Sequence, residues 1–235
     1  MVLPLNLAMT PSEIAAAAVL PERISWMSCH FCSITEGITN IPDSLPEGAM
    51  LILTDRESCA GHSPDLVAQQ LLEAVQRLGC ESVLLDFQRP CNAESAAMVS
   101  AVTAVLPCPV AVTEAFAAES SRPVFLAPCP LQIPLESYLR PWEGHEIWLE
   151  AALCQQRISV TRSGTTITPV YPAVQPDGGF YDERLHCRYH TTVSDDQITF
   201  TLFDTPQTLQ QKLENAHSLG VRRAVGLWQE LGSLS

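Results

Sequence analysis

The middle of the chain alternates apolar strands with a helical segment, and this alternation constrains the fold more than any other feature. Residues 50–54 and 82–87 form largely apolar runs, which are typical of strands buried on both faces of a sheet. Between them, residues 64–78 repeat their apolar side chains at helical spacing, begin at a Ser-Pro-Asp sequence and stop before Gly79. A strand–helix–strand unit of this length predicts a parallel βαβ crossover.

The alternation continues on both sides of this unit. Thr10 begins a predicted short helix, and residues 24–27 form a predicted strand that leads into a loop carrying Cys29, His30 and Cys32. Further predicted elements are a helix over 96–106, strands over 110–112, 124–126 and 147–149, a helix over 208–219 and a last strand over 221–228. Residues 157–203 differ, because β-branched residues alternate there between turn signals and predict an antiparallel insertion. The chain is therefore predicted to be a parallel α/β protein.

Length and charge narrow the classes of protein that fit. A chain of 235 residues that is 46% apolar fits one domain, 1–235, with a sizeable core. Its 26 acidic and 13 basic side chains give a net charge of −13. Nucleic acids and anionic membrane surfaces both require a positive field, so the charge argues against either as a partner.

Cysteine usage and hydropathy bear on the compartment. The nine cysteines are scattered through apolar segments, a pattern typical of a reducing environment rather than of a disulfide framework. The best apolar stretch, 14–20, is far shorter than the roughly 20 residues of a membrane-spanning helix. No basic residue precedes it, unlike the apolar core of a signal peptide. We therefore expect a cytoplasmic protein.

Acids and amides gather where the predicted strands end. They are Asp55, Asp86, Gln88, Glu114, Glu150 and Glu230. The carboxyl ends of parallel strands are where α/β proteins hold their sites. Carboxylates and amides hydrogen-bond to hydroxyl groups, and an indole such as that of Trp228 covers the apolar face of a sugar ring. The pattern favours a polyhydroxylated ligand, although a solvated strand end is polar in any α/β protein.

The order of features near the C-terminus carries a family resemblance. Tyr189 lies in a strand-like run; residues 200–204, a helical segment with Lys212, and the sequence over 219–232 follow it. Residues 181–232 in this order resemble the C-terminal part of glycoside hydrolase family 18 barrels, particularly bacterial chitinase-like and spore-cortex hydrolase-like members. The resemblance implies a TIM-like (β/α)8 barrel, compact or partly trimmed, with a small antiparallel β insertion before the last helix and strand. It also implies that Trp228 lies on the barrel floor.

The resemblance extends to the fourth strand, where the family carries alternating carboxylates that end in a glutamate. Residues 81–88 align there. Asp86 fits the carboxylate that orients the substrate's acetamide, Phe87 fits the intervening aromatic residue, and Leu84 replaces the inner acid. Gln88 occupies the position of the catalytic acid. A carboxamide has no proton to donate, so this position lacks general acid catalysis, which is usually worth roughly 10²–10⁴-fold in rate.

We therefore predict a family 18-like protein that binds an N-acetylglucosamine-type glycan, or another polyhydroxylated small molecule, with little or no hydrolysis. Substrate-assisted hydrolysis in this family uses the acetamido oxygen of the sugar as the nucleophile, and we expect no cofactor. Asp86 and Gln88 are the residues at the predicted catalytic positions. The predicted sugar-binding residues are Phe87, Glu114, Glu150, Trp228 and Glu230. The oligomeric state stays open.

Two alternatives remain at this point. The first is an active glycosidase in which Glu114, Glu150 or Glu230 serves as a relocated acid, although each also fits a solvated rim carboxylate. The second is a zinc-stabilised structural or interaction protein, because Cys29 and Cys32 form a C-x-x-C pair, and Cys59 with His62 forms a C-x-x-H pair. In a chain that uses cysteine this freely, such pairs also arise among half-buried thiols that bind nothing.

Overall fold

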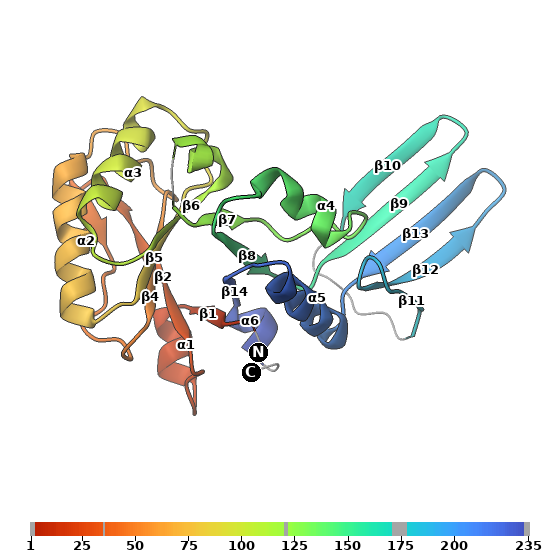
Figure 1. The fold of residues 1–235 in the computed structure, drawn as a ribbon, viewed down its shortest axis with the longest axis horizontal. Helices are drawn as coiled ribbons and strands as arrows, with labels where there is room; N and C mark the ends of the chain where they lie inside the picture. Colours follow the sequence, from red (N-terminus) through yellow and green to blue (C-terminus); the bar gives the residue numbers. More distant parts are fainter. Residues whose placement is uncertain (1–2, 35, 120–121, 171–177, 233–235) are drawn as a thin grey trace.

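Eight parallel strands close into a barrel in the computed structural model, which describes residues 3–34, 36–119, 122–170 and 178–232 (Figure 1). The barrel strands are β1 (Leu5–Met9), β2 (Ile24–Cys32), β4 (Met50–Thr54), β5 (Ser82–Asp86), β6 (Val110–Thr113), β7 (Val124–Leu126), β8 (Ile147–Ala151) and β14 (Arg223–Leu227). β1 pairs in parallel with both β14 and β2, and this double pairing closes the ring. The predicted TIM-like (β/α)8 barrel is confirmed.

The helical layer is trimmed. Three helices run for 13 to 15 residues: α2 (Pro64–Leu78), α3 (Ala93–Val105) and α5 (Pro206–Ser218). The others are short, namely α1 (Pro11–Ala16), η1 (Glu114–Glu119), α4 (Leu135–Leu139), η2 (Arg140–Trp142) and α6 (Trp228–Leu231). Between β2 and β4 the chain forms β3 (Gly37–Thr39), which pairs antiparallel with β2. Shortened connections therefore fit a full barrel into 235 residues.

Local sequence signals fix the ends of the long helices. The Ser63 side chain accepts a hydrogen bond from the Leu66 N–H and so caps the first turn of α2. Gly79 ends the same helix with φ of 65°, in the left-handed region that a residue without a Cβ enters at least cost. The predicted helix, opened by Ser63-Pro64-Asp65 and stopped by Gly79, is thus confirmed.

Several predicted boundaries are wrong. The helices predicted from 96 and 208 begin at Ala93 and Pro206, and two strand ends affect candidate site residues. β2 does not end at residue 27 but continues to Cys32, so Cys29 and His30 lie in a strand rather than in a loop. Cys29 is fully buried, because a thiol packs as a small apolar side chain. At the other end of the chain, β14 stops at Leu227, and Trp228 begins α6 instead of ending the strand.

Side chains of each barrel strand point alternately inward and outward. The inward cluster comprises Ala8, Met50, Ile52, Leu84, Ala111, Phe125, Trp148 and Val225, with Met27 packed against it. Val83, Leu85 and Phe87 belong instead to the outer cluster under α2 and α3. This two-residue period directs position 84, and with it 86 and 88, to the inside of the barrel.

A five-stranded antiparallel sheet, hereafter the arm, projects from the barrel between β8 and α5 (Figure 1). It contains β9 (Gln155–Thr161), β10 (Gly164–Pro169), β11 (Phe180–Asp182), β12 (Cys187–Val193) and β13 (Gln197–Phe203). Across the sheet the order is β10-β9-β13-β12-β11. The predicted antiparallel insertion is confirmed, and it begins two residues earlier than predicted.

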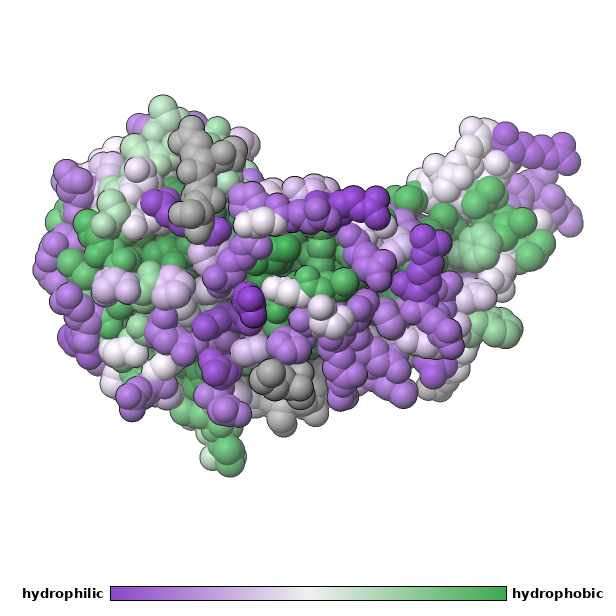
Figure 2. Space-filling model, viewed as in Figure 1, coloured by the Kyte–Doolittle hydropathy of each residue, from purple (hydrophilic) through white to green (hydrophobic). Residues whose placement is uncertain are grey.

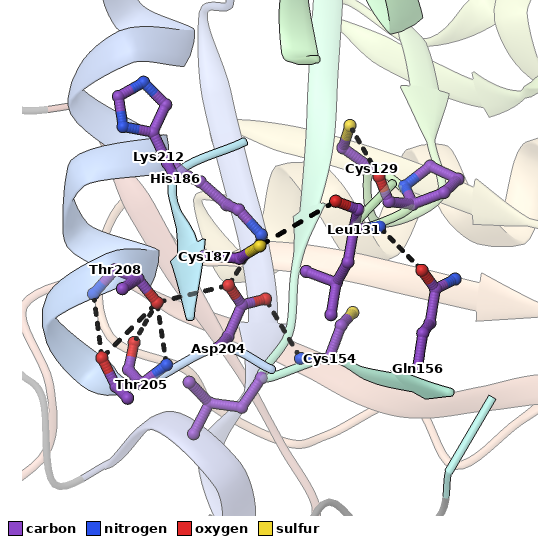
Figure 3. A network of polar contacts seen from close by, with 12 residues as sticks. Cys129, Leu131, Cys154, Gln156, His186, Cys187, Asp204, Thr205, Thr208 and Lys212 are labelled. Carbon is purple, nitrogen blue, oxygen red and sulfur yellow. Dashed lines mark hydrogen bonds and ion pairs between the residues drawn. The ribbon is translucent and has the colours of Figure 1, made fainter. Parts of the chain in front are cut away.

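A buried ion pair ties the arm to the barrel (Figure 3). Asp204, which follows the last arm strand, is 3% exposed, and it accepts a hydrogen bond from Lys212 Nζ on α5 at 2.6 Å. Its second carboxylate oxygen accepts the Cys154 N–H at 3.2 Å, just before the first arm strand. One carboxylate therefore holds both connections of the arm and the helix that leads back into the barrel.

None of the helices that the structure describes is long and apolar enough to cross a membrane.

Replacing Lys212 with Met should destabilise the protein by about 3–5 kcal/mol, because the Asp204 carboxylate would remain buried without its cation. Chemical denaturation of the two chains measures this loss. Arg222→Met is the matched control, since it removes an exposed cation from the neighbouring segment. A loss for Lys212→Met no larger than that of the control would contradict the role given to the pair.

Candidate functional site

A cavity of about 370 Å³ opens at the carboxyl ends of the barrel strands. Its polar lining comprises Thr54, Asp86, Gln88 and Glu150. Its apolar lining comprises Ala8, Met27, Ile52, Leu84, Phe125, Val225, Gly226 and Leu227. Carboxylate and amide groups thus converge over an apolar floor, at the end of the barrel where α/β barrels hold their sites.

Asp86 and Gln88 contact each other directly in this cavity. Gln88 Nε2 donates a short hydrogen bond to Asp86 Oδ1. The pKa of Asp86 is raised, mainly because the carboxyl group is buried. The hydrogen bond from Gln88 lowers the pKa, and the nearby Asp55 carboxylate raises it further. The amide of Gln88 and the carboxylate of Asp86 thus line the cavity as a hydrogen-bonded pair.

Asp55 holds the backbone that carries Gln88. Its side chain is 6% exposed, and its two carboxylate oxygens accept the N–H groups of Gln88 and Arg89 at 2.8 Å each. Arg89 Nε returns a hydrogen bond to the Asp55 carbonyl at 2.8 Å. The sequence marks Asp55 as an acid at the end of a strand. Only the structure shows that Asp55 positions the segment that follows β5.

Glu150 enters the same cavity from β8. Burial, the Asp86 carboxylate and the Glu230 carboxylate together raise its pKa to about 7. A carboxyl group with this pKa is partly protonated near neutral pH, so it can donate as well as accept a hydrogen bond.

The other predicted site residues lie outside the cavity lining. Phe87 is 2% exposed in the outer cluster, with its ring 5.6 Å from that of Phe31. Glu114 is exposed and accepts a hydrogen bond from the Tyr138 hydroxyl at 3.4 Å. Glu230 accepts the N–H of Leu153.

Trp228 also lies away from this cavity. It packs against a second cluster outside the barrel, which contains Leu3, Leu7 and Leu231. The preceding residue, Leu227, lines the cavity. Of the predicted site residues, the structure brings together Asp86, Gln88 and Glu150.

The cysteine and histidine pairs do not converge on a metal. Over the described ranges, no group of three or more His, Cys, Asp or Glu side chains is placed to hold an ion. Cys29 Sγ donates to the Asn40 carbonyl at 3.6 Å, and His62 Nε2 lies 3.1 Å from the Cys32 carbonyl. The zinc alternative is not supported.

The chain thus forms a closed parallel barrel with an antiparallel insertion before its last helix and strand, and Asp86 ends the fourth barrel strand. No family model matches the sequence, and no curated protein matches it.

Solved structures with this fold are similar over nearly the whole chain. A family 18 N-acetylglucosaminidase from Paenibacillus barengoltzii aligns with a TM-score of 0.61 and 10% identity, covering 95% of this chain and 94% of that one. The spore cortex-lytic enzyme of Bacillus cereus aligns with a TM-score of 0.53 and 11% identity, covering 95% and 70%. The C-terminal domain of a putative chitinase from Desulfitobacterium hafniense aligns with a TM-score of 0.55 and 8% identity, covering 97% and 94%. At sequence identities this low, the structural similarity shows the fold alone.

The raised pKa of Glu150 predicts a specific dependence of stability on pH. Because the pKa of this group rises from 4.5 to about 7 on folding, its contribution to stability is present at low pH and is lost as the pH rises towards 7. Over that interval the wild type should lose about 2 kcal/mol relative to Glu150→Gln, measured by chemical denaturation. Glu94→Gln, an exposed change on α3, serves as the control. Parallel pH profiles for the wild type and Glu150→Gln would contradict the placement of Glu150.

Proposed function

We propose that this protein binds an N-acetylglucosamine-type glycan in the Asp86–Gln88–Glu150 cavity and hydrolyses it little or not at all. The observation that carries the proposal is Gln88, which stands in the cavity beside Asp86 at the position where the family 18 resemblance implies the catalytic acid. A carboxamide cannot transfer a proton to a leaving oxygen, but it can still hydrogen-bond to a sugar. Gln88 can therefore support binding without general acid catalysis.

Several features support binding. The cavity, about 370 Å³, falls within the usual range of small-molecule sites, roughly 300–1,000 Å³. Asp86, Gln88 and Glu150 offer both donors and acceptors for sugar hydroxyl or acetamide groups. The apolar floor suits the carbon-bearing face of a sugar ring. The net charge of −13 supports a neutral ligand over nucleic acid or an anionic membrane.

A second candidate function is favoured by Glu150. It lines the same cavity, and its pKa of about 7 is in the range in which a carboxylic acid can act as a general acid near neutral pH. In this alternative the protein is an active glycosidase with Glu150 as a relocated acid.

Binding is tested by isothermal titration calorimetry with chitooligosaccharides. Asp86→Ala should weaken binding about tenfold or more, because the ligand loses a hydrogen bond to a charged group. Glu114→Ala and Trp228→Ala are the controls, because both residues lie outside the cavity lining. Both variants should bind chitooligosaccharides as the wild type does. No heat with any N-acetylglucosamine ligand would overturn the proposal.

Turnover of a fluorogenic chitobioside separates the two functions. The wild type should show no turnover. Gln88→Glu restores a carboxylic acid, which is usually worth roughly 10²–10⁴-fold in rate. The gain should lie near the lower end of this range, because Leu84 still replaces the inner carboxylate. Wild-type turnover that disappears in Glu150→Gln but not in Glu114→Gln would establish the second candidate instead.

A further inference from the structure

One face of the arm is largely apolar, with a threonine, Thr165 or Thr191, at one edge of each row. Antiparallel pairing sets Val160 opposite Ile198, and Ile198 opposite Val193, so that these three side chains share one face. The next row on the same face contains Ile167, Ile158 and Phe200. Cross-strand neighbours always point to the same side of a sheet, so the two rows form one continuous surface.

This surface is open to solvent. The exposed fractions are 71% for Val193, 47% for Ile167, 40% for Ile198 and 36% for Val160. Figure 2 shows hydrophobic residues gathered over this part of the arm. The opposite face of the same strands carries Ser159, Thr166, Thr192 and Thr199. Contiguous exposed apolar patches of this kind mark interaction surfaces.

The arm carries much less net negative charge than the rest of the molecule. Residues 155–203 carry four basic and five acidic side chains, whereas the remainder of the chain carries nine basic and 21 acidic ones. Two barrels of this protein therefore repel each other, while two arms repel each other far less. The arms therefore add little repulsion at the contact itself.

The two hairpin tips of the arm carry opposite charges. Arg162 lies at the turn between β9 and β10, and Asp195 with Asp196 lies at the turn between β12 and β13. Both turns lie at the same end of the sheet, because Gln197 pairs with Thr161.

We infer that the apolar face of the arm binds the arm of a second copy of this chain, as a twofold dimer of stacked sheets. A twofold axis that is parallel to the strands and passes between β9 and β13 reverses the strand order. β10 of one copy then lies over β12 of the other. Arg162 of each copy then faces Asp195 and Asp196 of the other, and the apolar rows cover each other. This complementarity selects the second copy as the occupant.

Other occupants fit this surface less well. Sugars stack on aromatic rings, and the two rows contain one aromatic residue, Phe200. The other aromatic pair of this face, Phe180 and Tyr189, lies at the base of the arm, away from the hairpin tips. An anionic membrane is repelled by a net charge of −13. The surface is therefore distinct in chemistry from the cavity at the barrel mouth.

The inference is tested by sedimentation equilibrium of the full chain across a dilution series. The wild type should dimerise reversibly, and Ile198→Asp should weaken the dimer about tenfold or more by placing a carboxylate in the apolar contact. Thr192→Asp adds the same charge on the opposite face of the arm and should leave the dimer intact. Circular dichroism confirms that both variants are folded. A wild-type chain that stays monomeric throughout, or a dimer that Ile198→Asp leaves unchanged, would overturn the inference.

Charge reversal tests the twofold arrangement without touching the apolar face. Arg162→Glu alone, and Asp195→Arg with Asp196→Arg, should each weaken the dimer, and the triple variant that combines them should restore it. Failure of the triple variant to regain affinity would overturn the stacked twofold geometry. Because the arm lies outside the cavity lining, all of these variants should bind chitooligosaccharides as the wild type does.

Discussion

The closed ring of parallel strands is the constraint on which the rest of the structure depends. Closure through the two pairings of β1 forces each strand to direct alternate side chains inward. On β5 this alternation turns Leu84 into the core, carries Asp86 and Gln88 to the mouth, and buries Phe87 outside. Shifting the strand by one residue would exchange the two sets, so the site depends on the barrel register.

The arm and the site meet at Glu150. On one side Glu150 lines the cavity with Asp86 and Gln88. On the other it borders a second cavity of about 20 Å³, whose lining includes Asp204 and Lys212. That volume holds about one water molecule between polar groups. The ion pair that anchors the arm and the carboxyl group with the strongly raised pKa thus line the same small cavity.

The sequence was sufficient for those parts of the fold that local patterns specify. The apolar runs of β4 and β5, the capped helix α2 and the β-branched arm all follow from periodicity and turn residues. It failed where tertiary packing decides. The short strand pattern over 24–27 predicts a loop at Cys29, whereas the strand continues and the Cys29 thiol is buried in β2.

The sequence predicts only the part of the site that follows from strand order. Asp86, Gln88 and Glu150 end strands, and their convergence follows from parallel topology. The sequence predicts Asp55 as an acid at a strand end, but its hydrogen bonds to the segment after β5 depend on inter-strand register. Whether Leu227 or Trp228 enters the cavity depends on where β14 ends, and strand ends are the least reliable part of a pattern-based prediction.

A crystal structure of the protein with chitobiose tests the central claim most directly. The account predicts an intact disaccharide, with one sugar ring in the cavity within hydrogen-bonding distance of Asp86, Gln88 and Glu150. A sugar bound elsewhere, or a cleaved product in the cavity, would contradict the claim that this barrel binds a glycan without hydrolysing it.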